Sequence, residues 1–387
     1  MLRVLVAEFL LANSNAGKAA ARSMLDEAEA MLKAVFADFV RLPNVNATVM
    51  LSAELAMRLT EANPMCSTLF EDGVLILRGE LQPETLPAIL RGDSQQPAFD
   101  AVLLIAPECD GVLVSLLKAV QESDASPKLS LNLNWRLAEI FADKRMTDVW
   151  LRQHGIATIP TRTIDNTTAE VLRSTARQNS FIESVTQTDY SAVDQFAVLK
   201  SRDGAGAEGV RIVRLKSRLF QDLSQQCSDN DRWILQPLMP GVACSVGFIG
   251  GGRRGPTTIL PPARQTIVAT DGIVSYQGGQ IPCAPTIASR ITPIAKQIAV
   301  ALGSFDGYVG ADLLVDLSAP EDSEGVVRVV EINPRLCTSY VGYRAIAEDN
   351  LAAWMLQLHG SKTIQWKAEG VTFSACGGTR LTSTPTA

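Results

Sequence analysis

The sequence predicts an α/β domain with a parallel sheet, followed by segments of α+β structure. The chain opens with the apolar run Arg3–Leu10, which has the length of a strand, and apolar residues then recur at helical spacing over Lys18–Val40. Three more strand candidates, separated by helical patterns at Ser52–Ala62, Pro83–Leu90 and Val112–Gln121, lie at Val45–Leu51, Val74–Leu77 and Ala101–Ala106. Strands that alternate with helices indicate a parallel sheet covered on both faces, so we expect an N-terminal domain over residues 1–130.

The rest of the chain alternates less regularly and predicts α+β structure. A helical lead-in at Asn134–Gly155 precedes a small unit of two helices and three strands, at Thr168–Asn179, Phe196–Lys200, Val210–Arg214, Leu215–Gln226 and Trp233–Pro237. From Ala243 onward we expect longer strands of mixed polarity, then helix Pro293–Leu302, a hairpin, helix Ala347–Leu358 and strand Thr363–Phe373. We divide this part into a central lobe over residues 131–238 and a C-terminal lobe over residues 239–387.

Composition and charge argue against several classes of function. The 387 residues are 47% hydrophobic and 20% charged, as is usual for a globular protein. A formal charge of -6 without a basic block argues against nucleic acid as a partner. Seven scattered cysteines are typical of a reduced cytosolic protein, and two histidines exclude a histidine-rich zinc site and argue against a Ser-His-Asp triad. The apolar start, Met1–Leu11, lacks the length of a membrane span and the pattern of a signal peptide, so we expect a cytoplasmic protein without a membrane partner.

A predicted hairpin near the C-terminus gathers acidic side chains. It consists of strand Tyr308–Asp316, a polar loop, and strand Val326–Asn333, which ends at Pro334-Arg335. Glu331 and Asn333 are two residues apart on one strand and share a face, and Asp312 meets them if the strands pair. Two carboxylates and an amide oxygen are ligands that suit Mg²⁺. The alternative is a plain strand that leaves the core at a proline turn.

Two lysines and a glycine-rich loop predict a site for phosphates. The segment Phe196–Val210 is a strand that ends in Lys200, then a loop with glycines at 204, 206 and 209, then the start of another strand. Small residues let the backbone approach an anion, and a lysine supplies the opposite charge. Lys144 precedes this loop on the lead-in helix. An ordinary glycine-rich hairpin and a solvated helix lysine are the alternatives.

The segment Trp233–Ser245 predicts a strand edge followed by a proline-glycine turn. Such an edge can bind adenine through main-chain hydrogen bonds, with Leu235 and Leu238 packing on the ring. The alternative interpretation is a domain linker.

The order of these parts resembles that of the ATP-grasp superfamily from Asp143 to about Arg344. The resemblance implies two α+β lobes that close on ATP, with Mg²⁺, or Mn²⁺ as an alternative, as the cofactor ion. It assigns Lys144 and Lys200 to the phosphates, and the loop Ser201–Gly209, with Gly204, Ala205 and Gly206, to a flap that covers them. The adenine edge is formed by Gln236, Pro237 and Leu238, and the metal ligands are Asp312, Glu331 and Asn333. Arg335 faces the transferred phosphoryl group or the acyl phosphate. Lys200 and Arg335 are the expected catalytic residues. The chain departs from the family pattern at Gln236 and Ala243, where acids are usual, so the resemblance assigns no acid to the ribose.

A narrower resemblance is to the tyramine–glutamate ligases, which build methanofuran-type cofactors of one-carbon metabolism. It rests on Asp26–Phe39, Arg264-Gln265, the Tyr276–Gly279 turn and the run Ile332–Arg344. It implies that the segment with Ser339 and Tyr340 lines the acceptor side. Arg264 and Arg335 are candidates to hold a carboxylate, although Arg264 fits a surface arginine equally well.

The activity implied by both resemblances is the ligation of a carboxylate to an amine through an acyl phosphate, with glutamyl transfer to an aromatic amine as the specific reaction. The expected partners are ATP and small carboxylate and amine substrates, and a homodimer is left open. The alternatives are a ligase of the D-alanine–D-alanine type, a carboxylase that uses bicarbonate, and a nucleotide-binding protein without turnover. No histidine lies near the motifs, so the sequence does not name the base that deprotonates the amine.

Overall fold

The computed structural model describes residues 1–61, 75–93, 97–124, 129–164, 196–214, 232–253, 255–320, 325–360 and 362–383. The helices expected at Thr168–Asn179 and Leu215–Gln226 lie outside these ranges.

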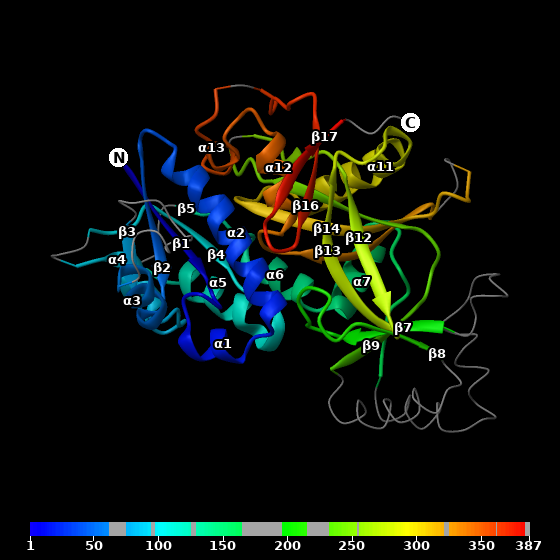
Figure 1. The fold of residues 1–387 in the computed structure, drawn as a ribbon, viewed down its shortest axis with the longest axis horizontal. Helices are drawn as coiled ribbons and strands as arrows, with labels where there is room; N and C mark the ends of the chain where they lie inside the picture. The colour runs from blue at the N-terminus through cyan, green and yellow to red at the C-terminus, as the bar shows by residue number, and fades with distance from the viewer. Residues whose placement is uncertain are drawn as a thin grey trace.

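A five-stranded parallel sheet forms the N-terminal part of the molecule (Figure 1). Its order is β3-β2-β1-β4-β5, with bounds β1 (Leu2–Glu8), β2 (Val45–Leu51), β3 (Leu75–Arg78), β4 (Ala101–Ile105) and β5 (Leu129–Ser130). The connecting helices are α1 (Ser14–Ala19), α2 (Arg22–Val40), α3 (Ala53–Glu61), α4 (Leu86–Arg91) and α5 (Val112–Gln121), the last preceded by the short helix η2 (Cys109–Gly111). The parallel sheet expected from the alternating pattern is confirmed.

The two faces of this sheet belong to different hydrophobic cores. Val4 and Val6 of β1 pack into the core that contains α2, whereas Leu5 and Ala7 pack with residues of α4 and α5. Successive strand residues point to opposite faces, so a strand that is apolar at every position is buried on both sides.

The second sheet is antiparallel in its strand pairs and contains twelve strands. Its main order is β15-β14-β10-β12-β13-β8-β7-β9-β6, with β11, β16 and β17 attached beside β10 and β13. Their bounds are β6 (Arg162–Thr163), β7 (Phe196–Ser201), β8 (Arg211–Arg214), β9 (Trp233–Pro237), β10 (Val242–Ile249), β11 (Thr258–Ile259), β12 (Ala263–Thr270), β13 (Ile273–Ile281), β14 (Tyr308–Val315), β15 (Val327–Asn333), β16 (Gly370–Ser374) and β17 (Thr379–Thr382). Between β13 and β8 the register joins only Ile273 to Arg211, so this narrow pairing connects β8, β7, β9 and β6 to the other strands of the sheet.

The helices of this second part are α6 (Trp135–Ala142), α7 (Lys144–Gln153), α11 (Pro285–Leu302), α12 (Ser339–Ile346) and α13 (Leu351–Met355). The expected single lead-in helix is two helices, because Asp143 ends α6 and caps α7 by accepting hydrogen bonds from the backbone N–H groups of Arg145 and Met146. Helix α11 begins earlier than predicted, since Pro285 stands in its first turn, where the missing N–H costs nothing.

Helix α2 packs on the parallel sheet, and α12 and α13 of the second part of the molecule pack against it (Figure 1). Asp38 of α2 is 4% exposed and accepts hydrogen bonds from Tyr340 Oη at 2.8 Å and Arg344 Nε at 2.7 Å. These hydrogen bonds join the C-terminal end of α2 to α12. Within the described ranges, no helix combines the length and apolar character that crossing a membrane requires.

Candidate active site

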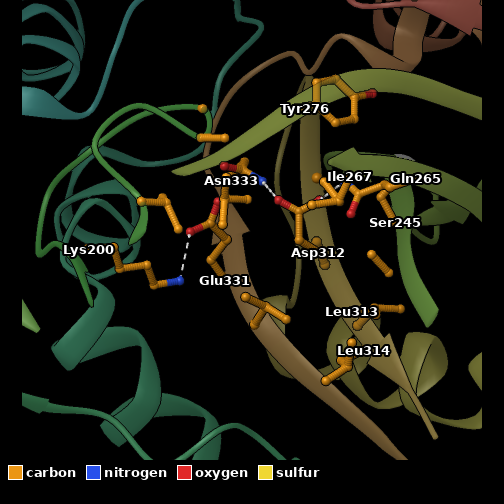
Figure 2. A pocket seen from close by; sticks show the side chains of 18 of the residues that line it. Lys200, Ser245, Gln265, Ile267, Tyr276, Asp312, Leu313, Leu314, Glu331 and Asn333 are labelled. Atoms are coloured by element: carbon orange, nitrogen blue, oxygen red, sulfur yellow. Dashed lines mark hydrogen bonds and ion pairs between the residues drawn. The ribbon is translucent and has the colours of Figure 1, made fainter. Parts of the chain in front are cut away.

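The acidic hairpin forms as expected from β14 and β15. Asp312 stands opposite Glu331 and Gly310 opposite Asn333, with an irregularity in the register after Asp312. Asn333 Nδ2 donates to Asp312 Oδ2 at 2.9 Å, and Gln265 Nε2 of β12 donates to Asp312 Oδ1 at 2.7 Å (Figure 2). The two carboxylates and the amide therefore lie together on one face of the sheet.

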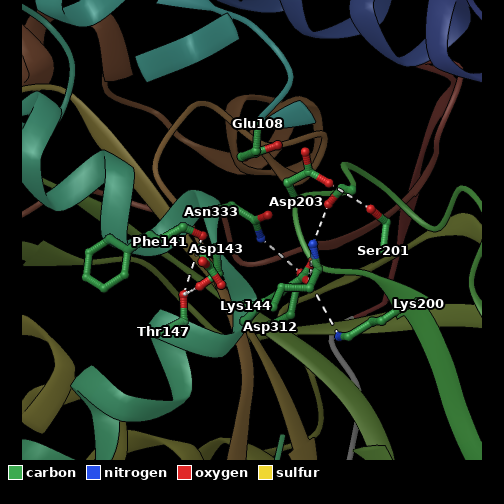
Figure 3. Close-up of polar contacts among 12 residues, drawn as sticks. Glu108, Phe141, Asp143, Lys144, Thr147, Lys200, Ser201, Asp203, Asp312 and Asn333 are labelled. Atoms are coloured by element: carbon green, nitrogen blue, oxygen red, sulfur yellow. Dashed lines mark hydrogen bonds and ion pairs between the residues drawn. The ribbon is translucent and has the colours of Figure 1, made fainter. Parts of the chain in front are cut away.

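Both predicted lysines converge on Glu331. Lys144 Nζ and Lys200 Nζ each lie 3.6 Å from Glu331 Oε2. Figure 2 shows Lys200 pointing toward Glu331, and Figure 3 shows the two lysines. Lys144 is the first residue of α7 and Lys200 belongs to β7, so elements far apart in the sequence deliver the two cations. The side chains are 7% and 6% exposed. A pair of buried ammonium groups this close together favours a ligand with several negative charges.

The charges in this cluster shift one another's protonation. Burial raises the pKa of Asp312 to about 7, and the neighbouring Glu331 carboxylate acts in the same direction. Burial alone would also raise the pKa of Glu331, but Lys144 and Lys200 lower it below its usual value. Burial, aided by Lys144, lowers the pKa of Lys200. A divalent cation would therefore reduce the repulsion between the two carboxylates, and phosphate groups would reduce the repulsion between the two ammonium groups.

The donor set fits Mg²⁺. Asp312, Glu331 and Asn333 supply hard oxygen atoms, which is the chemistry that this ion prefers, and it usually takes only one or two carboxylates plus waters and phosphate oxygens. Among the described residues no group of three or more His, Cys, Asp or Glu side chains forms a self-sufficient cage. The site therefore suits an ion that arrives with a phosphate ligand.

Hydrogen bonds from Lys144 and within the loop hold the start of the glycine-rich loop that follows β7 (Figure 3). Lys144 N donates to Arg202 O at 2.9 Å, Lys144 Nζ donates to Gly204 O, and Ser201 Oγ donates to Asp203 Oδ1 at 2.8 Å. Gly206 has φ +63°, a conformation that L-residues with a side chain adopt only with strain. The first lysine thus also anchors the loop that would cover the phosphates.

A cavity of about 310 Å³ extends from this cluster along the sheet, and we call it the first cavity. Its lining combines Lys200, Glu331 and Asp312 with apolar side chains that include Ile267, Leu313 and Leu314 (Figure 2). The predicted adenine edge, Gln236, Pro237 and Leu238, lines the same cavity. One end of the cavity is therefore charged, and the walls beyond it are apolar, as a nucleotide requires.

Arg335 lies between the first cavity and a neighbouring one, since it lines both. Its Nε donates to Glu108 Oε1 at 2.9 Å, and the two side chains are 11% and 5% exposed. Although burial opposes it, Glu108 raises the pKa of Arg335, which keeps the guanidinium charged. Glu108 Oε2 is buried without a hydrogen-bond partner among the described residues. The sequence analysis missed Glu108, although ligands gather at the carboxyl ends of parallel strands and Glu108 follows the end of β4.

A family model of the ATP-grasp domain matches residues 141–339, which is more than half of the chain. The chain belongs to the ATP-grasp family. Members of this family are ATP-dependent ligases, and the predicted ATP-dependent enzyme is confirmed at that level. A comparison with curated proteins gave no match.

Solved structures with the ATP-grasp fold are similar over nearly the whole chain. An ATP-grasp superfamily protein from Archaeoglobus fulgidus has a TM-score of 0.61 at 19% identity, covering 96% of this chain and 92% of that one. Carboxyaminoimidazole ribonucleotide synthase from Aspergillus clavatus, complexed with ATP, has a TM-score of 0.62 at 16% identity, covering 96% and 81%. Biotin carboxylase from Campylobacter jejuni has a TM-score of 0.64 at 13% identity, covering 96% and 74%. At these identities the likeness shows the fold.

Both positions where this ATP-grasp chain departs from the family pattern line the first cavity. Gln236 is 3% exposed, and its Nε2 donates to Thr161 Oγ1 at 2.8 Å. Ala243 carries no polar side-chain atom. Neither position therefore offers a carboxylate to a ribose hydroxyl.

The structure places two predicted substrate residues, Arg264 and Tyr340, outside the lining of both cavities. Arg264 is exposed and lines neither cavity, because strand residues alternate and its neighbour Gln265 takes the inward face of β12. Tyr340 is fully buried in the hydrophobic core and donates to Asp38. Ser339 does line the first cavity, although it is only 5% exposed and its Oγ lies 3.3 Å from Tyr308 Oη. The predicted acceptor wall is thus mainly the buried first turn of α12.

Proposed function

We propose that the protein is an ATP- and Mg²⁺-dependent ligase that joins a carboxylate to an amine through an acyl phosphate. The observation that carries this proposal is the convergence of Lys144 and Lys200 on Glu331, beside Asp312. This arrangement combines two cations for a triphosphate with oxygen donors for the ion that accompanies it. The solved carboxylases and synthases of similar fold include complexes with ATP, ADP and MgADP.

In this mechanism the chain's own residues bind and orient the reacting groups. Lys144 and Lys200 hold the phosphates, and the loop Ser201–Gly209 covers them and excludes water. A substrate carboxylate oxygen attacks the γ-phosphorus, and the bond to the ADP oxygen breaks. Arg335, which faces both cavities, stabilises the acyl phosphate that results. A bound Mg²⁺ on Asp312, Glu331 and Asn333 would supply neutralisation of the phosphate charge.

The specific reaction that we propose is glutamyl transfer to an aromatic amine, as in the biosynthesis of a one-carbon cofactor. The support comes from the sequence: the segment Tyr276–Gly279 and the run Ile332–Arg344 resemble tyramine–glutamate ligases. The turn predicted at Tyr276–Gly279 is wrong, because this segment lies within strand β13. In the structure, Tyr276 and residues 337–339 line the first cavity close to the metal ligands. We also propose the division into domains over residues 1–130, 131–238 and 239–387, with ATP bound between the last two.

A second candidate is an ATP-grasp carboxylase that activates bicarbonate. The similar solved structures favour it, because several are named as carboxylases or carboxyaminoimidazole synthases, and one is a complex with MgADP and bicarbonate. The nucleotide site would be the same, so the acyl donor alone separates the two reactions.

Phosphate release from ATP and Mg²⁺ tests the proposal. We expect release that requires L-glutamate together with one amine from a panel containing tyramine and tyrosine, and that Glu331→Gln abolishes it. Release that requires bicarbonate and not glutamate would establish the carboxylase. Tight ATP binding with no release under any pairing would contradict both reactions and favour a nucleotide-binding protein without turnover.

A further inference from the structure

A second cavity of about 320 Å³ lies where the N-terminal sheet meets the flap. Its walls come from the carboxyl ends of β1 and β4, the first half of α2, residues 205–209 of the flap, the start of β13, and Arg335. Sequence reasoning assigned no ligand to it.

The first and second cavities share residues and therefore meet. Glu27, Gly206, Tyr276 and Arg335 are among the residues that line both. Figure 2 shows Tyr276 beside the strands that carry Asp312 and Gln265. A molecule in the second cavity can thus present one end to the site where the acyl phosphate forms, while its body stays outside the nucleotide cavity.

The second cavity has an acidic junction and an apolar wall. Glu27 stands at the junction, where Thr338 Oγ1 donates to its Oε2 at 3.1 Å. Arg335 stands at the same junction and interacts with Glu27, but its guanidinium is already paired with Glu108 at 2.9 Å, so two carboxylates share this one cation. Away from the junction one part of the wall is apolar, with Leu10, Met24, Ala28, Met31 and Ile105, and the rest includes the polar residues Glu8, Ser23, Glu208, Ser275 and Gln277.

These features select a ligand by its chemistry. An anion on the Arg335 side of the junction meets the guanidinium, whereas beside Glu27 an anion is repelled and an ammonium group gains a charge-assisted hydrogen bond. The apolar wall requires an apolar body behind that group, and a cavity of this size accepts about ten non-hydrogen atoms or more.

We propose that the second cavity binds the amine substrate, a primary amine with an apolar body, and that Glu27 anchors its ammonium group. This inference rests on the proposed ligase function. The nitrogen gives one proton to the Glu27 carboxylate before it attacks the acyl phosphate. As the C–N bond forms and the C–O bond to phosphate breaks, the second proton leaves with the phosphate.

Binding of 2-phenylethylamine and ethylamine to the full chain, measured by titration calorimetry with Mg²⁺ and a non-hydrolysable ATP analogue, tests the site. We expect 2-phenylethylamine to bind more tightly than ethylamine. Glu27→Gln should weaken both about tenfold or more, because a hydrogen bond to a charged group is lost. Met24→Ala should weaken 2-phenylethylamine severalfold and leave ethylamine nearly unchanged.

Glu29→Gln is the matched control, since Glu29 lies on the same helix, pairs with Lys33 and lines neither cavity. It should bind both amines as the wild type does. Equal loss in Glu27→Gln and Glu29→Gln, or no binding by the wild type, would overturn the assignment of the cavity.

Trapping of the acyl phosphate with hydroxylamine tests the proposed function separately. Hydroxamate that forms from ATP and L-glutamate without amine binding would keep the ligase and remove the amine site. Amine binding that depends on Glu27 without any hydroxamate from glutamate or bicarbonate would keep the site and contradict the ligase.

Discussion

Replacing Glu108 with glutamine should destabilise the fold by about 3–5 kcal/mol, because the Arg335 guanidinium would stay buried without its counter-charge. The two charged groups are 2.9 Å apart, with side chains that are 11% and 5% exposed. At an effective dielectric constant of about 20, unit charges at that separation attract by about 6 kcal/mol. The cost of burying both groups offsets part of this attraction, and the loss of one partner leaves that cost in place.

Urea unfolding followed by tryptophan fluorescence measures the effect. A double-mutant cycle with Arg335→Met isolates the pair, and we expect the double variant to be more stable than Glu108→Gln alone, since no unpaired charge remains. The matched control is the neighbouring pair between Arg232 and Asp110, whose side chains are 52% and 72% exposed. Asp110→Asn should cost less than about 1 kcal/mol, because water screens that pair.

A loss of less than about 1 kcal/mol in Glu108→Gln, equal to that of the exposed pair, would refute the reasoning. It would mean that the contact between the end of β4 and Arg335 does not fix the orientation of the guanidinium. The role proposed for Arg335 at the acyl phosphate would then lose its structural support.

Three further predictions concern the nucleotide site and the second cavity. Lys200→Met should weaken MgATP binding by about tenfold to a hundredfold, because a charge-assisted contact to phosphate is lost, and an unchanged Kd in calorimetry would contradict the assignment. Gly206→Ala should raise the KM for ATP by about fivefold, because φ at this position is +63° and an alanine there adds backbone strain of roughly 1 kcal/mol. The added Cβ meets no atom within 4 Å, so the effect comes from the backbone and not from a clash. A KM equal to the wild type would argue against a flap. Burial raises the pKa of Glu8 from 4.5 to about 8, so the folded state binds a proton at this carboxyl more tightly than the unfolded state does. The free energy of unfolding therefore falls as pH rises from 4.5 towards 8. Glu8→Gln should therefore gain up to a few kcal/mol relative to the wild type between pH 5 and pH 9 in urea unfolding, and a pH-independent difference would show that Glu8 does not titrate in this range.

Much of the fold follows from local pattern. The centre of β1, Val4–Ala7, has no polar position to face water, and its alternating residues do enter two different cores. The helix over Lys18–Val40 was also recognisable, although the structure starts α2 at Arg22 after a separate α1. By contrast, α12 was interpreted as a substrate wall, because its first residues follow the acidic motif directly. Only its tertiary contacts with α2 show that Tyr340 faces a core.

The part of the candidate site that lies on a single hairpin could be predicted from the sequence. Asp312, Glu331 and Asn333 sit on a single hairpin, where the two-residue period of a strand places them together. The convergence of Lys144 and Lys200 came from the family resemblance, since nothing local relates α7 to β7. Glu108 and Glu27 come from the N-terminal domain and meet the site only through tertiary packing. Arg264 and Gln265 are neighbours on β12, so only one of them can point into the first cavity, and in the structure that residue is Gln265.

Transfer of ¹⁸O tests the central claim most directly. If a substrate carboxylate attacks the γ-phosphorus, the phosphate released from ATP must carry one oxygen of that carboxylate. With ¹⁸O-labelled L-glutamate and the amine that supports turnover, we predict one ¹⁸O atom per phosphate, seen by ³¹P NMR, and loss of the signal in Glu331→Gln. Amine-dependent turnover that releases phosphate free of ¹⁸O would contradict the acyl phosphate, and with it the role of the lysine–carboxylate cluster.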